Sequence, residues 1–220
     1  MNNRGIFIAI EGPIGAGKTT LANLLSEHFG YTLLREIVEE NPFLSKFYTD
    51  IKEYALQTEA FFLFNRVKQL EDVEKSYLSK NMGVVSDYHI VKNLIFAGIT
   101  LDNNQFHRYK QVYNIFVNDL PQPDIVIYLN SNTDTLMKRI ATRDRSFERQ
   151  MDRAYIDNLR NEYKYYFNPL SIKHNFTGKI PLIIELDNSN LDFLNNSQDR
   201  EFIIKKVEKA ISSLGGIQNV

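Results

Sequence analysis

The sequence predicts an α/β fold of three layers, in which helices cover both faces of a five-stranded parallel sheet. Five short apolar runs recur along the 220 residues, and amphipathic stretches long enough to form helices separate them. A glycine-rich turn also joins the first apolar run to the first helical stretch. Parallel neighbouring strands require long crossover connections, which helices usually supply, so these features together favour an open parallel sheet.

Each strand is expected where a short apolar run is bounded by turn residues, and each helix where apolar residues recur every three or four positions. In chain order, the strands are expected at 7–10, 32–34, 84–86, 125–129 and 182–186. The helices are expected at 18–29, 51–79, 105–118, 133–142, 152–173 and 199–213. Pro121 and Pro123 set the start of the fourth strand, and the Asn-rich stretch 188–196 is expected to be a loop.

Composition is typical of a single globular domain over residues 1–220, with 43% hydrophobic residues, a formal net charge of −1 and no cysteine. The charge balance gives no reason to expect polymeric nucleic acid or a membrane surface as a partner. Without cysteine, disulfides, thiol nucleophiles and cysteine-based zinc sites are excluded. No apolar run is long enough to cross a membrane, and the first strand begins too early to leave a targeting peptide, so a cytoplasmic location is expected.

The glycine-rich turn is the most specific motif in the chain. The phosphate-binding pattern G-x-x-x-x-G-K-[ST] is matched by Gly12-Pro13-Ile14-Gly15-Ala16-Gly17-Lys18-Thr19. The next residue, Thr20, is also expected to contact the nucleotide. Backbone N–H groups of such a turn converge on an anion, and the dipole of the following helix favours negative charge. Lys18 is expected to reach the outer phosphates of a nucleoside triphosphate, and the Thr19 hydroxyl to ligate Mg²⁺.

Two carboxylates follow strands that should flank this turn. Glu36 comes directly after the second strand, where it could orient or deprotonate a hydroxyl that attacks a γ-phosphate. The alternative is a solvated acidic cluster, which is the preferred interpretation for Glu39 and Glu40. Asp87 follows the third strand, where it could hold Mg²⁺, serve as the base instead of Glu36, or only cap a helix.

Basic residues gather after the fourth strand. Arg139 and Arg143 lie four residues apart and so share a helix face, and Arg145 follows in a turn. Such a cluster can clamp a triphosphate and offset charge in the transition state, which makes Arg143 an expected catalytic group beside Lys18. Arg149 and Arg153 are better explained as solvated surface.

The helix expected at 51–79 carries Gln57 among apolar neighbours. A buried Gln offers one acceptor and two donors, which suits the edge of a nucleobase. Nearby aromatic residues could line a slot for a planar ring, although most of them are expected in the core: Tyr48, Tyr54, Phe61 and Phe64.

Taken in order, these motifs resemble the deoxyribonucleoside kinases, and within that family the bacterial deoxyguanosine kinases. The resemblance spans nearly the whole chain and rests on the phosphate loop together with Glu36-Ile37-Val38, Phe47-Tyr48, Asp87-Tyr88-His89, Arg139-x-x-x-Arg143-x-Arg145-x-x-Glu148 and Leu186-Asp187-Asn188. It implies a P-loop kinase fold, a lid around 139–149, Mg-ATP as phosphate donor, a deoxyribonucleoside 5′-hydroxyl as acceptor, and a homodimer formed through a helical face.

The same resemblance implies roles for single residues. Glu36 would be the catalytic carboxylate, Tyr48 would contact the sugar, Gln57 would read the base and Phe96 would pack on it. Further residues would line the lid or border the adenine of ATP, namely Arg143, Arg145 and Asp187. Two positions depart from the family pattern: Tyr88 stands in place of an arginine, so that a lid arginine could hold Glu36 instead, and Ala154-Tyr155 stands in place of Glu-Tyr.

Guanine is the expected base. Family members that accept adenine or cytosine tend to place an Asp downstream of the third strand, where this chain has Lys92 and Asn93, which could instead donate to the guanine carbonyl. A site built for one polar edge rejects another, because its own groups are left unpaired. A deoxyadenosine/deoxycytidine kinase is the main alternative.

Two more distant alternatives are less well supported. A thymidylate kinase would need glycines after Arg35 to hold a second phosphate, and Glu39 and Glu40 would repel that phosphate. A nucleotide-binding switch without a small-molecule acceptor would not need Gln57 near Glu36 and would usually carry an element that positions water.

Overall fold

The computed structural model describes residues 4–149, 151–172 and 180–217. Within these residues, five parallel strands form one sheet in the order β2-β3-β1-β4-β5. The strands are β1 (Phe7–Glu11), β2 (Thr32–Leu34), β3 (Val84–Ser86), β4 (Ile125–Asn130) and β5 (Leu182–Asp187). All the strands expected from sequence are therefore confirmed, to within one residue at each end.

The helices expected from sequence are also present. The structure contains α1 (Lys18–Phe29), α2 (Leu44–Phe47), α3 (Ile51–Ser76), α4 (Lys92–Thr100), α5 (Asn103–Val117), α6 (Thr133–Arg143), α7 (Arg153–Tyr166) and α9 (Ser197–Ile217), with short 3-10 turns η1 (Leu78–Lys80) and η2 (Ser146–Glu148). The helix expected at 51–79 ends at Ser76 and continues as η1. The helix expected at 152–173 ends at Tyr166, and residue 173 lies outside the described residues.

Within the described ranges, two helices were not expected from the sequence, the short α2 and the nine-residue α4. α4 is buried on nearly every side, and the side chains of Asn93, Ile95 and Ala97 are fully buried. A helix without a solvent-facing side shows no amphipathic period, and its apolar, β-branched composition also suits a strand. This omission matters for the active site because α4 carries Lys92 and Phe96.

Side-chain oxygens mark where several helices begin. Asp50 accepts from the Glu53 backbone N–H at the start of α3, and Asn132 accepts from Thr135 N–H at the start of α6. Asp102 and Gln105 form a reciprocal capping box at the start of α5. Each such cap contributes about 1 kcal/mol to helix stability and fixes the residue at which the chain leaves the preceding loop.

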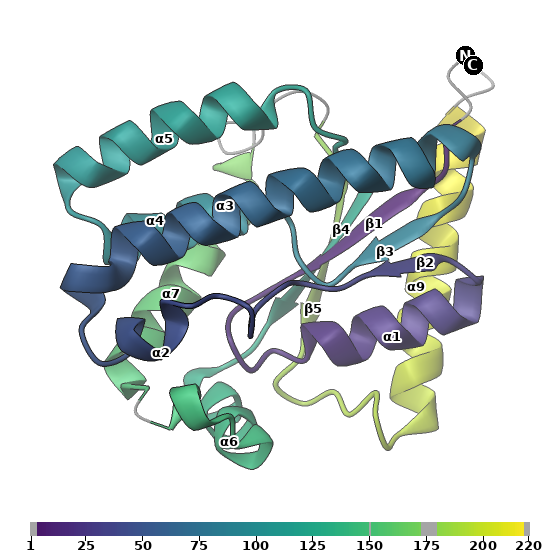
Figure 1. The fold of residues 1–220 in the computed structure, drawn as a ribbon. Coiled ribbons are helices and arrows are strands. Elements are labelled where there is room, and N and C mark those ends of the chain that lie inside the picture. The colour runs from purple at the N-terminus through teal and green to yellow at the C-terminus, as the bar shows by residue number, and fades with distance from the viewer. Residues whose placement is uncertain (1–3, 150, 173–179, 218–220) are drawn as a thin grey trace.

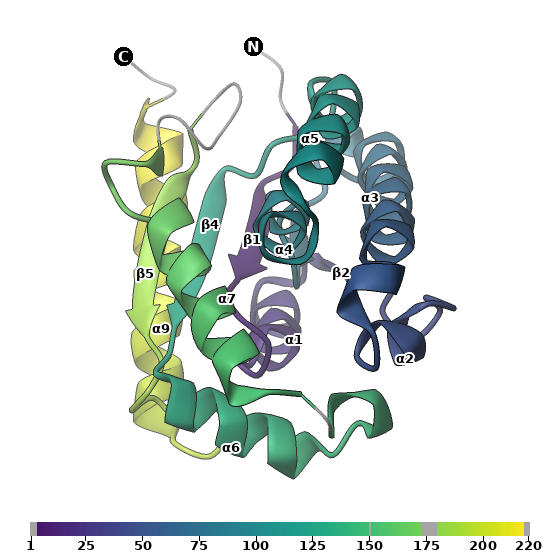
Figure 2. The same ribbon diagram turned by 90° about the vertical axis from the view of Figure 1, so that its left-hand side faces the viewer.

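The three expected layers follow from the alternation of side chains along β1. Ile8 and Ile10 pack with α1 and α9 on one face of the sheet, whereas Phe7 and Ala9 pack with helices on the other. Figure 1 shows α1 and α9 on one side of the strands and α3, α4 and α5 on the other, and Figure 2 shows α7 over β4 and β5.

The topology determines where a ligand can bind. After β3 the chain crosses to the far side of β1 to form β4, so the connections diverge at the carboxyl end of β1. In open α/β sheets such a point leaves a crevice beyond the strand ends. The phosphate-loop motif begins there, directly after β1. No helix within the described ranges is long and apolar enough to cross a membrane.

Candidate active site

The phosphate-binding turn connects β1 to α1 and requires glycine for its backbone. Gly15 and Gly17 have φ values of 83° and 88°, which are accessible to glycine but strained for other residues. A Cβ on Gly15 would also lie 2.8 Å from the Leu136 carbonyl oxygen, so side chains are excluded on steric grounds as well. The turn therefore presents backbone N–H groups at the start of α1, as an anion site needs.

Lys18 folds back across this turn. Its Nζ donates to the carbonyl oxygens of Gly12 and Pro13, at 2.8 and 3.0 Å. Burial, together with the nearby positive charge of Lys92, lowers the pKa of Lys18 to about 8. A phosphate bound in the turn would favour the charged form and offer the ammonium group a stronger acceptor than a carbonyl oxygen.

Asp87 joins the turn to the segment after β2. Thr19 Oγ1 donates to Asp87 Oδ2 at 2.9 Å, and the Glu36 backbone N–H donates to Asp87 Oδ1 at 2.7 Å. Burial, and then the charge of Glu36, raise the pKa of Asp87. The helix-cap alternative for Asp87 is wrong, because α4 begins at Lys92 with Val91 as its N-cap residue and no side-chain cap.

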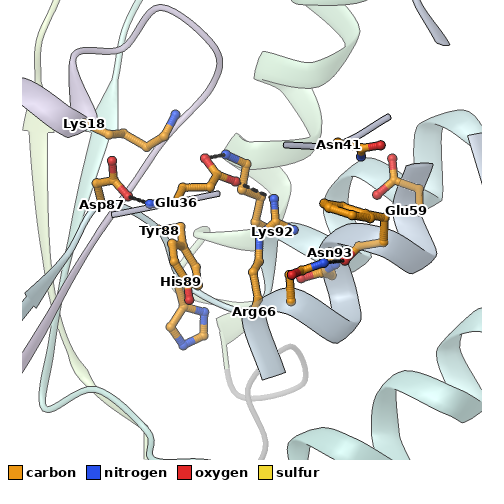
Figure 3. Close-up of polar contacts among 12 residues, drawn as sticks. Lys18, Glu36, Asn41, Glu59, Arg66, Asp87, Tyr88, His89, Lys92 and Asn93 are labelled. Atoms are coloured by element: carbon orange, nitrogen blue, oxygen red, sulfur yellow. Dashed lines mark hydrogen bonds and ion pairs between the residues drawn. The ribbon is translucent and has the colours of Figure 1, made fainter. Parts of the chain in front are cut away.

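Glu36 is the most strongly held carboxylate of the site. Its Oε2 accepts from Lys92 Nζ at 2.8 Å, and its Oε1 pairs with Arg66 Nη2. Burial on its own would raise the pKa of Glu36, but Lys92 and Arg66 lower it to about 2. Its side chain is 10% exposed, so the solvated-cluster alternative is wrong for Glu36. Figure 3 shows Glu36 between these two cations, with Asp87 and Lys18 beyond it.

The residues that hold Glu36 were not assigned to it from sequence. Tyr88, which stands where the family has an arginine, is fully buried and donates its hydroxyl to Gln69 Oε1 at 3.0 Å. Neither Tyr88 nor a lid arginine pairs with Glu36. Arg66 of α3 does so, with its guanidinium 4.7 Å from the centre of the Phe62 ring. The available signal was a charged residue at helical spacing from Leu63 and Leu70, on the face of α3 that is buried.

Glu11, which was also not assigned to the site from sequence, holds the start of the phosphate-binding turn. Glu11 ends β1 and is fully buried, and burial raises its pKa. Its Oε1 accepts from the Gly12 backbone N–H and from the Tyr163 hydroxyl, both at 2.9 Å. Its Oε2 accepts from the His89 backbone N–H at 2.8 Å. This carboxylate therefore ties the start of the turn to the segment after β3 and to α7.

The basic cluster after β4 is tied together mainly by Glu148. Arg143 binds both carboxylate oxygens of Glu148, with Nε 3.1 Å from Oε2, and Arg145 lies 3.9 Å from the carboxylates of Glu148 and Glu39. Arg139 points to the other side, where its Nη2 donates to the carbonyl oxygens of Asn188 and Leu191 at 3.1 and 3.3 Å. All three arginines line the cleft.

These elements surround a cleft of about 1090 Å³. One end is formed by the phosphate-binding turn, by one side of α6 from Thr135 to Arg143 and by residues 189–195 after β5. Aromatic residues line the other end, among them Tyr48 after α2, Phe62 of α3, Phe96 of α4 and Phe147 of η2. The rings of Tyr48 and Phe147 are parallel, with their centres 6.2 Å apart. The cleft thus has a charged end at the phosphate-binding turn, the Glu36 carboxylate next to it and an aromatic slot at the other end.

Three residues expected in the site lie outside it. Gln57 is exposed on α3 and does not line the cleft, so the expectation of a buried Gln at the base is wrong. Asn93 is fully buried, donates to the Tyr109 hydroxyl at 2.9 Å and also does not line the cleft. Asp187 is exposed, and its carboxylate accepts from the Ser189 backbone N–H at 3.1 Å.

Lys92 lies in the cleft but in a different position from the one expected. Its ammonium group is paired with Glu36 and lies 5.4 Å from the centre of the Phe96 ring. It therefore stands beside the carboxylate rather than at a free base edge. Tyr48 and Phe96, which were expected at the sugar and base, both line the cleft.

Comparison with known proteins gives consistent results. The sequence model of the deoxynucleoside kinase family matches residues 8–212. A deoxyguanosine kinase of Bacillus subtilis is 44% identical over 95% of this chain and 99% of its own length, and a deoxyadenosine kinase of Lactobacillus acidophilus is 30% identical over 96% and 98%. A solved deoxyadenosine kinase from M. mycoides with bound dATP superposes with a TM-score of 0.77 at 27% identity, covering 92% of this chain and 99% of that one.

Proposed function

The chain belongs to the deoxynucleoside kinase family, and we propose that it transfers the γ-phosphate of ATP to the 5′-hydroxyl of deoxyguanosine. The observation that carries this proposal is the position of Glu36, a carboxylate only 10% exposed and paired with two cations, between a phosphate-binding turn and an aromatic slot. A hydroxyl that sits on Glu36 would face phosphates held by the turn. This is the in-line arrangement that phosphoryl transfer needs.

Mg²⁺ is the proposed metal, held by Thr19 and Asp87 together with the phosphates. The two side chains already meet at 2.9 Å and offer only oxygen ligands, which Mg²⁺ prefers. Among the described residues, no group of three or more His, Cys, Asp or Glu side chains could hold a metal on its own. That pattern fits Mg²⁺, which usually takes one or two protein ligands and completes its shell with water and phosphate. When bound, it would offset phosphate charge.

Within this reaction the basic residues would act by position and charge. Lys18 would leave the carbonyl oxygens of the turn to contact the outer phosphates, and Arg143 and Arg145 would close over the γ-phosphate as part of a lid at 139–149. Glu148 holds these arginines near the cleft in the present structure. Arg139 would keep the turn aligned with residues 188–191 at the adenine end.

Glu36 would mainly orient the 5′-hydroxyl. A carboxylate with a pKa near 2 is a weak base, so it accepts a hydrogen bond readily but takes the proton only when the hydroxyl has become strongly acidic. In a loose transition state, that proton is lost late, after much of the bond to the leaving group has broken. Lys92 and Arg66 would keep Glu36 ionised and aimed at the slot.

The test is kcat/KM with Mg-ATP for deoxyguanosine, deoxyadenosine, deoxycytidine, thymidine and thymidine monophosphate, measured side by side. We expect deoxyguanosine to have the highest value, by at least about tenfold. Preference for deoxyadenosine or deoxycytidine would keep the kinase activity and change the substrate. Turnover of thymidine monophosphate alone would favour a thymidylate kinase, and ATP hydrolysis that is independent of any nucleoside would contradict the proposal.

A homodimer through the outer face of α3 and α5 is also proposed. This face exposes a cluster of large apolar side chains, Leu56, Phe64, Val112, Ile115 and Phe116. Ile115 is 71% exposed, and the rings of Phe64 and Phe116 meet edge to face at 5.4 Å, joining the two helices into one apolar surface. A contiguous apolar surface of this kind usually marks an interface.

Ile115→Glu is expected to shift the protein from dimer to monomer, because it would bury a charge at the centre of this surface. Sedimentation equilibrium at several protein concentrations measures the change. Lys164→Gln on α7, which alters the net charge equally at an exposed position away from the surface, is the control and should leave the mass unchanged. A wild-type monomer at all concentrations would contradict the proposed dimer. A cytoplasmic location stays a prediction from the sequence.

A further inference from the structure

We propose that Lys92 is a catalytic residue of the phosphoryl transfer: its ammonium group holds Glu36, binds an oxygen of the transferred phosphoryl group once ATP is present, and keeps that contact in the product. The proposal rests on the proposed function, since it adds a catalytic group to the same site. It differs from the expectation that Lys92 reads the base, and it separates Lys92 from Arg66, the other cation on Glu36.

The Lys92 ammonium group has hydrogen-bond donors to spare. An ammonium group carries three N–H donors and no acceptor. One donor reaches Glu36 Oε2 at 2.8 Å, and no other residue in the described part of the chain accepts from Lys92 Nζ. The side chain is 8% exposed and lines the cleft, so acceptors for the remaining donors have to come from the cleft. A ligand that brings anionic oxygens to this point would supply them with strong, charge-assisted hydrogen bonds.

Lys92 and Lys18 are two ammonium groups close enough to repel each other. Burial, and then the charge of Lys92, lower the pKa of Lys18 to about 8. Of the two cations on Glu36, Lys92 is therefore the one that acts most on the phosphate-binding turn. Figure 3 shows the side chains of Lys18, Glu36 and Lys92 directed toward one another. An anion between the two ammonium groups would turn their repulsion into attraction, and the γ-phosphate is the anion that the proposed reaction brings there.

Arg66 holds Glu36 in a different way, as a fixed support. Its guanidinium lies 4.7 Å from the centre of the Phe62 ring and 5.7 Å from the centre of the Tyr88 ring, so packing restrains it. The Lys92 ammonium group instead ends a flexible four-carbon stem, and its donors can rotate to a new acceptor while one of them keeps Glu36. Support and reach are thus divided between the two cations.

The role of Lys92 follows from the bonds that change. The proton of the 5′-hydroxyl passes to Glu36, and the 5′-oxygen uses its electron pair to form a bond to the γ-phosphorus. The bond from that phosphorus to the oxygen that bridges to the β-phosphate breaks, and ADP leaves with the electron pair. Lys92 stays protonated throughout. Its charge would offset the negative charge on the oxygens of the phosphoryl group in transfer and hold that group beside Glu36.

The affinity for deoxyguanosine 5′-monophosphate tests the phosphate contact apart from the hold on Glu36. The titrations are made in Glu36→Gln, where the carboxylate that Lys92 holds is gone. Adding Lys92→Met to this variant should raise the dissociation constant for the monophosphate at least about tenfold, because a charge-assisted hydrogen bond to the phosphate is lost. The dissociation constant for deoxyguanosine, which has no phosphate, should change by less than about threefold.

Single-turnover rates in the same two variants give the second measurement. Lys92→Met should lower the rate of Glu36→Gln by at least about a further tenfold, because the charge of the phosphoryl group still has to be offset. A lysine that served only to hold Glu36 would have no carboxylate to hold in this background. Its loss would then change neither the rate nor the affinity for the monophosphate.

Two further variants serve as controls. Lys75→Met makes the same chemical change at an exposed position in the last turn of α3 and should leave both quantities within about twofold. Lys92→Gln removes the charge and keeps a polar side chain with N–H donors, so it replaces Lys92→Met if a melting curve shows that the methionine variant is unfolded. The same losses are expected from it, because the charge is what the phosphate binds.

The outcomes distinguish this proposal from the proposed function. If the wild type phosphorylates no deoxynucleoside, the proposed function fails and the proposal fails with it. If the wild type prefers another deoxynucleoside, that nucleoside and its 5′-monophosphate replace the guanine pair in the titrations. If the wild type is active but loss of the Lys92 charge in Glu36→Gln leaves the monophosphate affinity or the rate unchanged, the kinase assignment stands and the catalytic role of Lys92 is overturned.

Discussion

Glu36→Gln is expected to lower kcat about 10³-fold while the dissociation constant for Mg-ATP changes by less than about threefold. The amide can still form a hydrogen bond with a 5′-hydroxyl, but it cannot receive the proton and carries no charge. It also leaves Lys92 and Arg66 without the anion that both now contact. The loss should therefore fall on the chemical step, which single-turnover rates and direct ATP binding separate.

Two further measurements keep this prediction interpretable. Glu27→Gln, on the exposed side of α1, makes the same chemical change away from the cleft and should retain wild-type kcat. A melting curve identifies any loss of rate that is due to unfolding, since two buried cations lose their partner in Glu36→Gln. A folded Glu36→Gln variant with near wild-type kcat would assign the base role to Asp87, which lines the cleft and accepts from Thr19 at the end of the turn.

Lys18→Ala is expected to reduce kcat/KM for ATP about 10³-fold, through both a higher KM and a lower kcat. Lys18 is the cation that already lies across the phosphate-binding turn, and nothing else in the turn carries a positive charge. Its removal would weaken ATP binding in the ground state and would also withdraw charge compensation as the γ-phosphate moves. Steady-state kinetics and calorimetric titration with Mg-ATP measure the two effects separately.

Lys18→Arg is the informative companion variant. It keeps a positive charge at the same position, but a planar guanidinium is bulkier and cannot fold onto the two carbonyl oxygens as an ammonium group does. We expect partial recovery of ATP affinity with little recovery of kcat. A Lys18→Ala variant that binds Mg-ATP as tightly as the wild type would contradict a role for Lys18 in the ground-state complex.

Much of the fold follows from local sequence patterns. The strands are short apolar runs bounded by turns, and the buried run of β1 followed by glycines and Lys18 forms the strand, turn and helix start that the motif predicts. These features depend on interactions between residues close in sequence, so a pattern of a few positions contains the necessary information. α4 was missed because burial on nearly all sides removes the periodicity on which helix prediction depends.

Local patterns in the sequence therefore predict the layered sheet, the phosphate-binding turn and the positions of Glu36 and Asp87 directly after the second and third strands. Which side chains complete the site depends on tertiary packing. Arg66 and Lys92 lie 30 and 56 residues from Glu36 in sequence, and only the packing of α3 and α4 brings them together. The exposure of Gln57, which places it outside the cleft, had the same origin. α3 has apolar residues all round, so its sequence does not indicate which side faces the cleft until it packs beside α4 and α5.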